Sequence, residues 1–203
     1  FGRLSKEKGI LTLVKAFLRA AGLADGNAGG TDDARDASNA GTLPDTWDLH
    51  IVGDGPERES IEQLIALAGS QAASRIHLLG YKSGEDLQRE VGNARFSVLS
   101  SEWRENMPYS GLESLAAQTP IIGADIGGIP ELVEEGRTGF TFGSGNVNIL
   151  ADRLLETAMI GENDYAAMQR QCGEYVEKRC RQQTYAEQLI ERYTGLSGSK
   201  QER

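Results

Sequence analysis

Short apolar segments alternate with amphipathic segments along most of this chain, and this alternation restricts its fold more than any other feature of the sequence. Each apolar segment is bounded by turn residues such as Gly, Asp and Ser, which is typical of a buried strand. The predicted strands cover residues 49–52, 76–79, 96–99, 120–123 and 139–142. Apolar strands that are separated by helices indicate a parallel sheet with helices on both faces.

Helices are predicted wherever apolar residues recur at helical spacing. Residues 5–21 form the first, with Ser5 as its N-cap. The others cover residues 58–68, 85–91, 110–117, 129–134, 147–159, 165–179 and 184–193. This order of strands and helices predicts an α/β fold with a Rossmann-like, doubly wound parallel sheet.

Residues 24–46 break this order. They are rich in Gly, Asn and Asp and have no apolar period, so we expect a loop inserted at the surface. A length of 203 residues fits a single domain covering residues 1–203. Because the first predicted helix follows Phe1 closely, we expect the first strand of the sheet and a preceding domain to lie outside this chain.

The chain is acidic, with 21 Lys and Arg side chains against 30 Asp and Glu, a net charge of −9 and a pI near 4.8. A nucleic-acid surface is normally basic, so binding of nucleic acid is not expected. No apolar run approaches the ~18 residues that a membrane helix needs. Cys172 and Cys180 match neither a disulfide framework nor a zinc pattern, and a reducing, cytoplasmic setting is expected.

The sequence carries no recognisable metal-binding motif. It lacks an Asp-x-Asp pair and a run of His and Cys at ligand spacing. The two histidines, His50 and His77, lie within predicted strands and are expected to be half-buried there, not to act as acid–base catalysts. We therefore expect neither a metal ion nor another cofactor.

Four loops of marked composition open a helix or follow a predicted strand. They cover residues 2–9, 52–56, 102–113 and 124–131. In a doubly wound sheet such loops meet at the carboxyl edge, where glycines let the backbone approach a ligand and helix N-termini bind anions. We expect the four loops to form one binding site there.

The motifs in these loops resemble those of the C-terminal, donor-binding half of a family 4 GT-B glycosyltransferase (glycosyl transferases group 1). Residues 2–9 read G-R-L-x-x-x-K-G, and residues 53–56 read G-x-G-P. Glu105 and Glu113 form an E-x7-E pair, and residues 127–131 read G-G-x-x-E. Each motif is weak alone, but together, in this order, they make the resemblance specific.

The resemblance implies that Arg3 and Lys8, with Gly2 beside them, neutralise the diphosphate of a nucleotide sugar. Arg presents two parallel donors to phosphate oxygens, and Lys presents a mobile positive charge. Glu113 would accept hydrogen bonds from the two ribose hydroxyls, and Glu105 would face the donor hexose or its phosphates. Arg3, Lys8 and Glu105 are thereby implied as the catalytic residues.

The resemblance also assigns backbone groups to the donor. Where the family has a Gly-Phe-Gly-like loop, this chain has Asn106-Met107-Pro108-Tyr109-Ser110. Because Pro108 has no N–H, the N–H groups of Asn106 and Met107 are expected to reach the sugar. Those of Tyr109 and Ser110 are expected to reach the diphosphate.

Four further residues complete the predicted site. Gly53 and Gly55 are expected to let the backbone approach the ligand closely. Tyr81, in the loop after the second predicted strand, is expected to contact the base, together with its neighbour Lys82.

The function implied is metal-independent transfer of a sugar, with retention of the anomeric configuration, from a UDP-, GDP- or ADP-sugar to a glycan or lipid-linked acceptor. The preceding domain would bind the acceptor, and the complete enzyme could associate peripherally with a membrane. The loop 105–110 resembles those of bacterial enzymes that build polysaccharides. The apolar face of residues 185–193 could pair two copies as a homodimer.

Two alternatives remain open: a nucleotide-sugar epimerase of GT-B-like fold, and a non-enzymatic nucleotide-binding or interaction module. The Arg3 and Lys8 cations together with the E-x7-E pair favour transfer over epimerisation.

Overall fold

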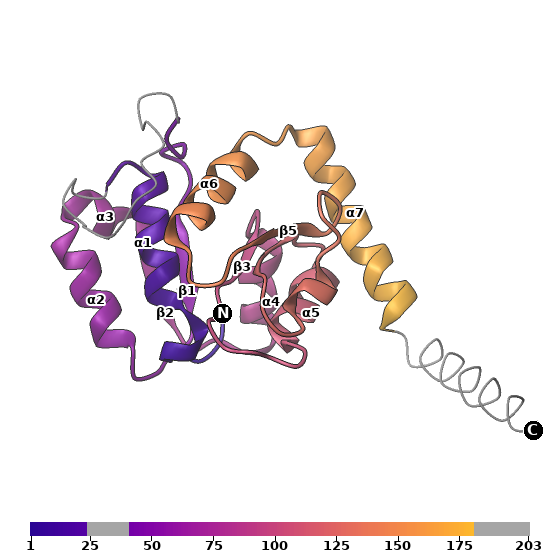
Figure 1. Ribbon diagram of the computed structural model, residues 1–203, viewed down its shortest axis with the longest axis horizontal. Coiled ribbons are helices and arrows are strands. Elements are labelled where there is room, and N and C mark those ends of the chain that lie inside the picture. Colours follow the sequence, from indigo (N-terminus) through magenta and orange to yellow (C-terminus); the bar gives the residue numbers. More distant parts are fainter. Residues whose placement is uncertain (24–40, 181–203) are drawn as a thin grey trace, which may run out of the picture.

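The computed structural model describes residues 1–23 and 41–180 (Figure 1). Most of the loop predicted at residues 24–46 lies outside the described residues. The helix predicted at residues 184–193, with its proposed homodimer contact, lies outside them as well.

Strands and helices alternate along the described chain (Figure 1). The strands are β1 (Leu49–Val52), β2 (Ile76–Gly80), β3 (Ser97–Leu99), β4 (Ile121–Ala124) and β5 (Gly139–Phe142). The α-helices are α1 (Ile10–Ala20), α2 (Arg58–Leu67), α3 (Ser70–Arg75), α4 (Gly84–Asn93), α5 (Tyr109–Ala116), α6 (Val147–Ala158) and α7 (Glu162–Arg179). Two short 3₁₀ helices are η1 (Lys6–Lys8) and η2 (Ile129–Leu132).

All the paired strands run parallel, as the sequence predicts. β1 pairs with β2, with His50 opposite His77. β4 lies between β3 and β5, with Ile121 opposite Gly139. The fold is α/β and Rossmann-like, but hydrogen bonds among the described residues join the strands into a two-stranded and a three-stranded sheet instead of one.

A cavity of about 480 Å³ separates the two sheets. Residues 46–52, which include β1, and residues 93–101, which include β3, line it. Phe1 lines it too, and the N-terminus lies between the two sheets (Figure 1). Within the described chain, β1 pairs only with β2 and β3 only with β4, so each has one strand edge without a partner.

Helices cover the sheets and form the core with them. α1 packs against α6 and α2, and α5 packs against α7. Val14 on α1, Leu115 on α5, Ile121 and Ile122 on β4 and Leu150 on α6 are completely buried. Each such side chain contributes about 1.5–3 kcal/mol through burial, and this rigid core fixes the loops at the sheet edge.

The first helix differs from its prediction. The segment 5–21 splits into η1 and α1, because Gly9 between them has a φ of 62°. A Cβ on Gly9 would lie 2.1 Å from the carbonyl oxygen of Ser100, so this close approach needs glycine. Ser5 is the N-cap residue of η1, as predicted, but its side chain makes no capping hydrogen bond.

The other elements lie close to their predicted bounds. β5 coincides with the predicted segment 139–142. α3 was not predicted, because its sequence SQAASR has no apolar face that periodicity could reveal. The helix predicted at 129–134 is the 3₁₀ helix η2, which has Pro130 in its first turn.

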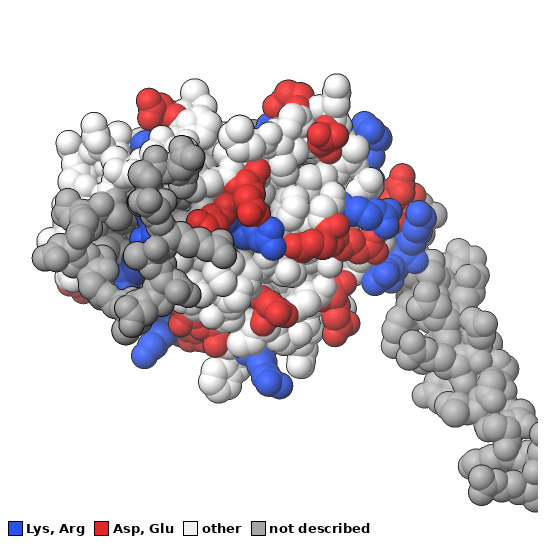
Figure 2. All heavy atoms as spheres, turned by 45° about the horizontal axis from the view of Figure 1, so that its top comes forward, with Lys and Arg blue, Asp and Glu red and all other residues white. Residues whose placement is uncertain are grey.

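Opposite charges are interspersed on the surface. Arg153 pairs with both Glu135 and Glu156, and Arg179 pairs with Glu134. The face in Figure 2 shows acidic and basic side chains side by side and no continuous basic area. No helix among residues 1–23 and 41–180 combines the length and the apolarity that crossing a membrane requires.

Candidate active site

A second cavity, of about 470 Å³, lies where the N-terminal loop, the end of β1, the loop after β2, the start of α4 and Glu113 on α5 meet. Gly2, Arg3, Gly53, Tyr81 and Glu113, all predicted site residues, line it. They converge because the carboxyl ends of parallel strands share one edge of a sheet.

The cavity between the sheets opens beside the second one. Gly2 and Arg3 line both cavities, whereas Lys8, Glu105 and Ser110 line the larger one. The three residues implied as catalytic, Arg3, Lys8 and Glu105, therefore lie around one cavity.

Lys8 and Glu105 form the ion pair of the site. The Lys8 Nζ lies 2.8 Å from the Glu105 Oε1, and both side chains are partly buried. The Ser101 hydroxyl donates to the same carboxylate oxygen, and the Ser100 hydroxyl donates to the Lys8 carbonyl oxygen at 2.9 Å. These contacts hold the Lys8 ammonium at the cavity wall.

Arg3 and Glu113 differ from Lys8 and Glu105 because they do not pair with each other or with another described side chain. Both side chains are exposed, and the structure gives neither an ion pair with any described residue. A guanidinium and a carboxylate on the same cavity, neither in an ion pair with a described residue, can bind a phosphate and a pair of hydroxyls.

The pKa of the Phe1 amino group shows that Lys8 and Glu113 both lie near Phe1. Burial lowers the pKa of this group, the charge of Lys8 lowers it further, and the charge of Glu113 opposes both effects. Lys8 and Glu113 therefore both lie near Phe1, although they are far apart in the sequence.

Gly127 and Gly128 support the loop that carries Glu105. The Gly128 N–H donates to the Glu105 carbonyl oxygen at 2.7 Å. A Cβ on Gly128 would lie 1.8 Å from the Asn106 carbonyl oxygen, and one on Gly127 2.5 Å from the Glu105 carbonyl oxygen. This glycine pair was identified as a motif from the sequence, but its support of the Glu105 loop was not predicted. Two consecutive glycines after a strand are the feature that indicates such close backbone packing.

The N-terminus of α5 faces the larger cavity. Its N-cap residue is Pro108, which makes no side-chain hydrogen bond to the helix. Pro108 and Ser110 both line the cavity. The structure assigns the N–H groups of Tyr109 and Ser110 no acceptor among the described residues. Free N–H groups and the helix dipole favour an anion at such an end.

The remaining predicted site residues line neither cavity. Gly55 packs against the backbone of Leu4, where a Cβ would lie 2.3 Å from the carbonyl oxygen, so it shapes the N-terminal loop. Asn106 and Met107 are exposed on the loop that leads into α5, and Tyr109 is exposed as the first residue of that helix. Their donation to the sugar or the diphosphate stays a prediction.

The chain is similar in sequence to known glycosyltransferases. A family model described as "Glycosyl transferases group 1" matches residues 1–159. N-acetyl-alpha-D-glucosaminyl L-malate synthase of Bacillus anthracis is 28% identical over 145 residues, which cover 71% of this chain and 35% of that protein. The amylovoran biosynthesis glycosyltransferase AmsK of Erwinia amylovora is 28% identical over 150 residues, 71% of this chain and 36% of that protein. The chain thus spans about a third of the length of these relatives.

Solved structures share the fold. Anabaena Alr3699/HepE in complex with UDP superimposes with a TM-score of 0.71 at 20% identity, over 96% of this chain and 48% of that one. The C-terminal domain of a glycosyl transferase group 1 family protein (LpcC) from Francisella tularensis gives a TM-score of 0.67 at 16% identity, over 90% of this chain and 84% of that one. At these identities the likeness concerns the fold.

Proposed function

Because the chain belongs to the group 1 glycosyltransferases, we propose that it is the donor-binding half of a retaining transferase that moves a sugar from a nucleotide diphosphate sugar to a glycan or lipid-linked acceptor. The observation that carries this proposal is the convergence of Arg3, Lys8, Glu105 and Glu113 on two neighbouring cavities. Neither an epimerase nor a non-enzymatic module is favoured by the relatives, which are named as synthases and transferases of sugars.

The proposed chemistry is stabilisation of the leaving group. As the bond from the anomeric carbon to the phosphate breaks, negative charge grows on the diphosphate. Arg3 and Lys8, which line the cavity, supply positive charge there, and the free N–H groups at the start of α5 supply donors. Charge that is already in place for the transition state commonly gives the largest catalytic effect. This step needs no metal ion and no other cofactor.

Glu105 has a positioning role in this proposal. Its carboxylate holds Lys8 at 2.8 Å and is itself held by Ser101 and, through the backbone, by Gly128. The hexose would lie beside this pair, where the second carboxylate oxygen can accept from a sugar hydroxyl.

The nucleoside would occupy the second cavity. Glu113 would accept hydrogen bonds from the ribose hydroxyls, and Tyr81, which is 79% exposed, would lie against the base. UDP is the first nucleotide to test, because Alr3699/HepE was solved with UDP and with UDP-glucose.

The acceptor would be bound by a domain that is not in this chain, across the cavities from the residues described here. We expect Trp103 and Tyr109, which are 69% and 81% exposed, to face that domain. A cytoplasmic location accords with two free cysteines, and peripheral membrane association of the complete enzyme stays a prediction.

Binding of UDP by the Glu113→Ala variant tests the ribose assignment. We expect this variant to bind UDP about tenfold to a hundredfold more weakly than the wild type, since a hydrogen bond to a charged group contributes roughly 1.5–3 kcal/mol. Titration calorimetry with UDP and with 2′,3′-dideoxy-UDP measures this, and the dideoxy compound should bind both proteins alike.

Glu131→Ala is the matched control, because this exposed carboxylate lines neither cavity. It should leave UDP affinity unchanged. Equal UDP affinity of the wild type and Glu113→Ala, or an equal loss for both nucleotides, would remove Glu113 from the ribose site.

We also propose that an extended segment, parallel to β1, fills the cavity between the sheets in the complete enzyme. The Gly2 N–H donates to the Val52 carbonyl oxygen at 2.9 Å, and the Leu4 N–H donates to the Asp54 carbonyl oxygen at 2.9 Å. Residues 2–4 therefore run parallel to the chain that leaves β1, and residues adjoining Phe1 on its N-terminal side would continue between β1 and β3.

Thermal unfolding of a chain lengthened by its native N-terminal neighbours tests this strand. Burying two apolar side chains contributes about 3–6 kcal/mol, and each kcal/mol raises the melting temperature of a chain of this size by about 2–4 °C. We expect a rise of about 10 °C over this chain, measured by calorimetry. An equally long Gly-Ser extension is the control, and an equal melting temperature for both extensions would contradict the proposal.

A further inference from the structure

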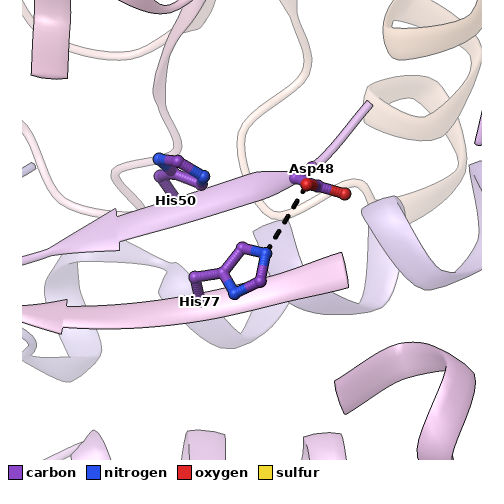
Figure 3. Close-up of side chains that lie close together, drawn as sticks. All are labelled: Asp48, His50 and His77. Atoms are coloured by element: carbon purple, nitrogen blue, oxygen red, sulfur yellow. Dashed lines mark ion pairs between the residues drawn. The ribbon is translucent and has the colours of Figure 1, made fainter. Parts of the chain in front are cut away.

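Both histidines of the chain lie side by side on one face of the two-stranded sheet (Figure 3). His50 on β1 and His77 on β2 are direct partners in the parallel register. Their rings meet edge to face, with centroids 5.2 Å apart. The sequence predicted two separate strand residues, and the pairing of β1 with β2 brings them together.

Asp48 adds a carboxylate to this pair. It precedes His50 by two residues, which places both on the same side of an extended chain. The Asp48 Oδ2 lies 3.6 Å from the His77 Nε2 (Figure 3). One ligand atom from each of Asp48, His50 and His77 lies within 4.8 Å of the others.

The cluster is open to dissolved ions. The side chains of Asp48, His50 and His77 are 40%, 50% and 36% exposed. The cluster extends from the beginning of β1, whereas the donor site lies at the carboxyl ends of the strands. Asp48 and His50, like Arg3 and Glu105, line the cavity between the sheets, whereas His77 and Glu113 do not line it.

Glu90 on α4 orients one of the histidines. Its Oε2 lies 3.0 Å from the His50 Nδ1, and its Oε1 lies 3.0 Å from the Lys82 Nζ. A carboxylate on Nδ1 selects the tautomer in which Nε2 keeps its lone pair, as is usual for histidines that bind metals.

We propose that Asp48, His50 and His77 bind a zinc ion, with Glu90 as the positioning residue of His50. Two imidazole nitrogens and one carboxylate oxygen suit Zn²⁺, and three protein ligands leave its fourth position to water. The three ligand atoms, which lie within 4.8 Å of one another, would move closer together around the ion.

Zinc titration of the tag-free chain against a chromophoric chelator tests the site. We expect one Zn²⁺ per chain, and about a hundredfold lower affinity for His50→Ala and for His77→Ala. Asp48→Asn should lower affinity at least about tenfold, and Glu90→Gln by about tenfold to a hundredfold. Far-UV circular dichroism checks that each variant is folded.

Cys180 provides the matched control, because it is an exposed free thiol away from the cluster. Cys180→Ser should bind zinc as the wild type does. Since the chain contains only these two histidines, the ring resonances in an NMR titration report on this site alone, and both should shift with zinc. Absence of binding, unshifted histidine resonances, or loss of zinc in Cys180→Ser but not in the histidine variants would overturn the proposal.

Discussion

The Lys8→Ala variant of the complete transferase is expected to turn over about a hundredfold to a thousandfold more slowly than the wild type, which is the usual cost of removing one preorganised group that stabilises transition-state charge. Lys8 is held at the cavity wall by Glu105 at 2.8 Å. Its ammonium would meet the diphosphate most strongly when the bond to the sugar has begun to break. Steady-state kinetics with a nucleotide sugar measures the effect, which should fall mainly on kcat.

Lys6→Ala is the control for this prediction. Lys6 is exposed on the same 3₁₀ helix η1 and lines neither cavity, so its loss should change kcat less than about twofold. Lys8→Arg keeps the charge and should recover part of the rate. A Lys8→Ala enzyme within tenfold of wild-type kcat would show that Lys8 does not stabilise the leaving group.

Gly128→Ala is expected to destabilise the chain by about 3 kcal/mol or more, the upper range for forcing an atom into packed surroundings. The new Cβ would lie 1.8 Å from the Asn106 carbonyl oxygen. Gly128 has a φ of −89°, which alanine adopts freely, so the clash alone causes the loss. Urea unfolding followed by circular dichroism measures the change in the free energy of unfolding.

The same substitution should disturb the active site. The Gly128 N–H holds the Glu105 carbonyl oxygen, and displacing that loop moves the carboxylate that positions Lys8. Gly161→Ala is the control, because a Cβ there meets nothing within 4 Å and its φ is −66°. Stability of Gly128→Ala within about 1 kcal/mol of Gly161→Ala would mean that the glycine pair does not support the loop.

Local patterns account for the elements that the sequence predicted well. β5 and α2 are bounded by turn residues. The spacing of apolar residues within each element is enough to indicate a strand or a helix. The four motif-bearing loops were predicted to share an edge, because topology alone brings the carboxyl ends of parallel strands together. Gly2, Arg3, Gly53, Tyr81 and Glu113 line one cavity for that reason.

Contacts between distant residues could not be predicted in this way. Gly9 interrupts a helical period because the backbone of Ser100 approaches it, and no feature near Gly9 records that neighbour. The Lys8 and Glu105 pair likewise joins residues 97 positions apart. The motifs indicated that Lys8 and Glu105 are both functional residues. The distance between them, however, depends on how the loops pack.

The amino-acid sequence by itself determined the α/β class, the parallel arrangement and the residues gathered at the sheet edge, because these follow from periodicity and from the direction of the strands. Tertiary structure alone decided that Glu105 holds Lys8, that Gly128 supports Glu105, and that Asp48, His50 and His77 form a cluster. Each of these depends on atoms from separate segments meeting within a few ångströms, and such meetings are set by the packing of the whole core.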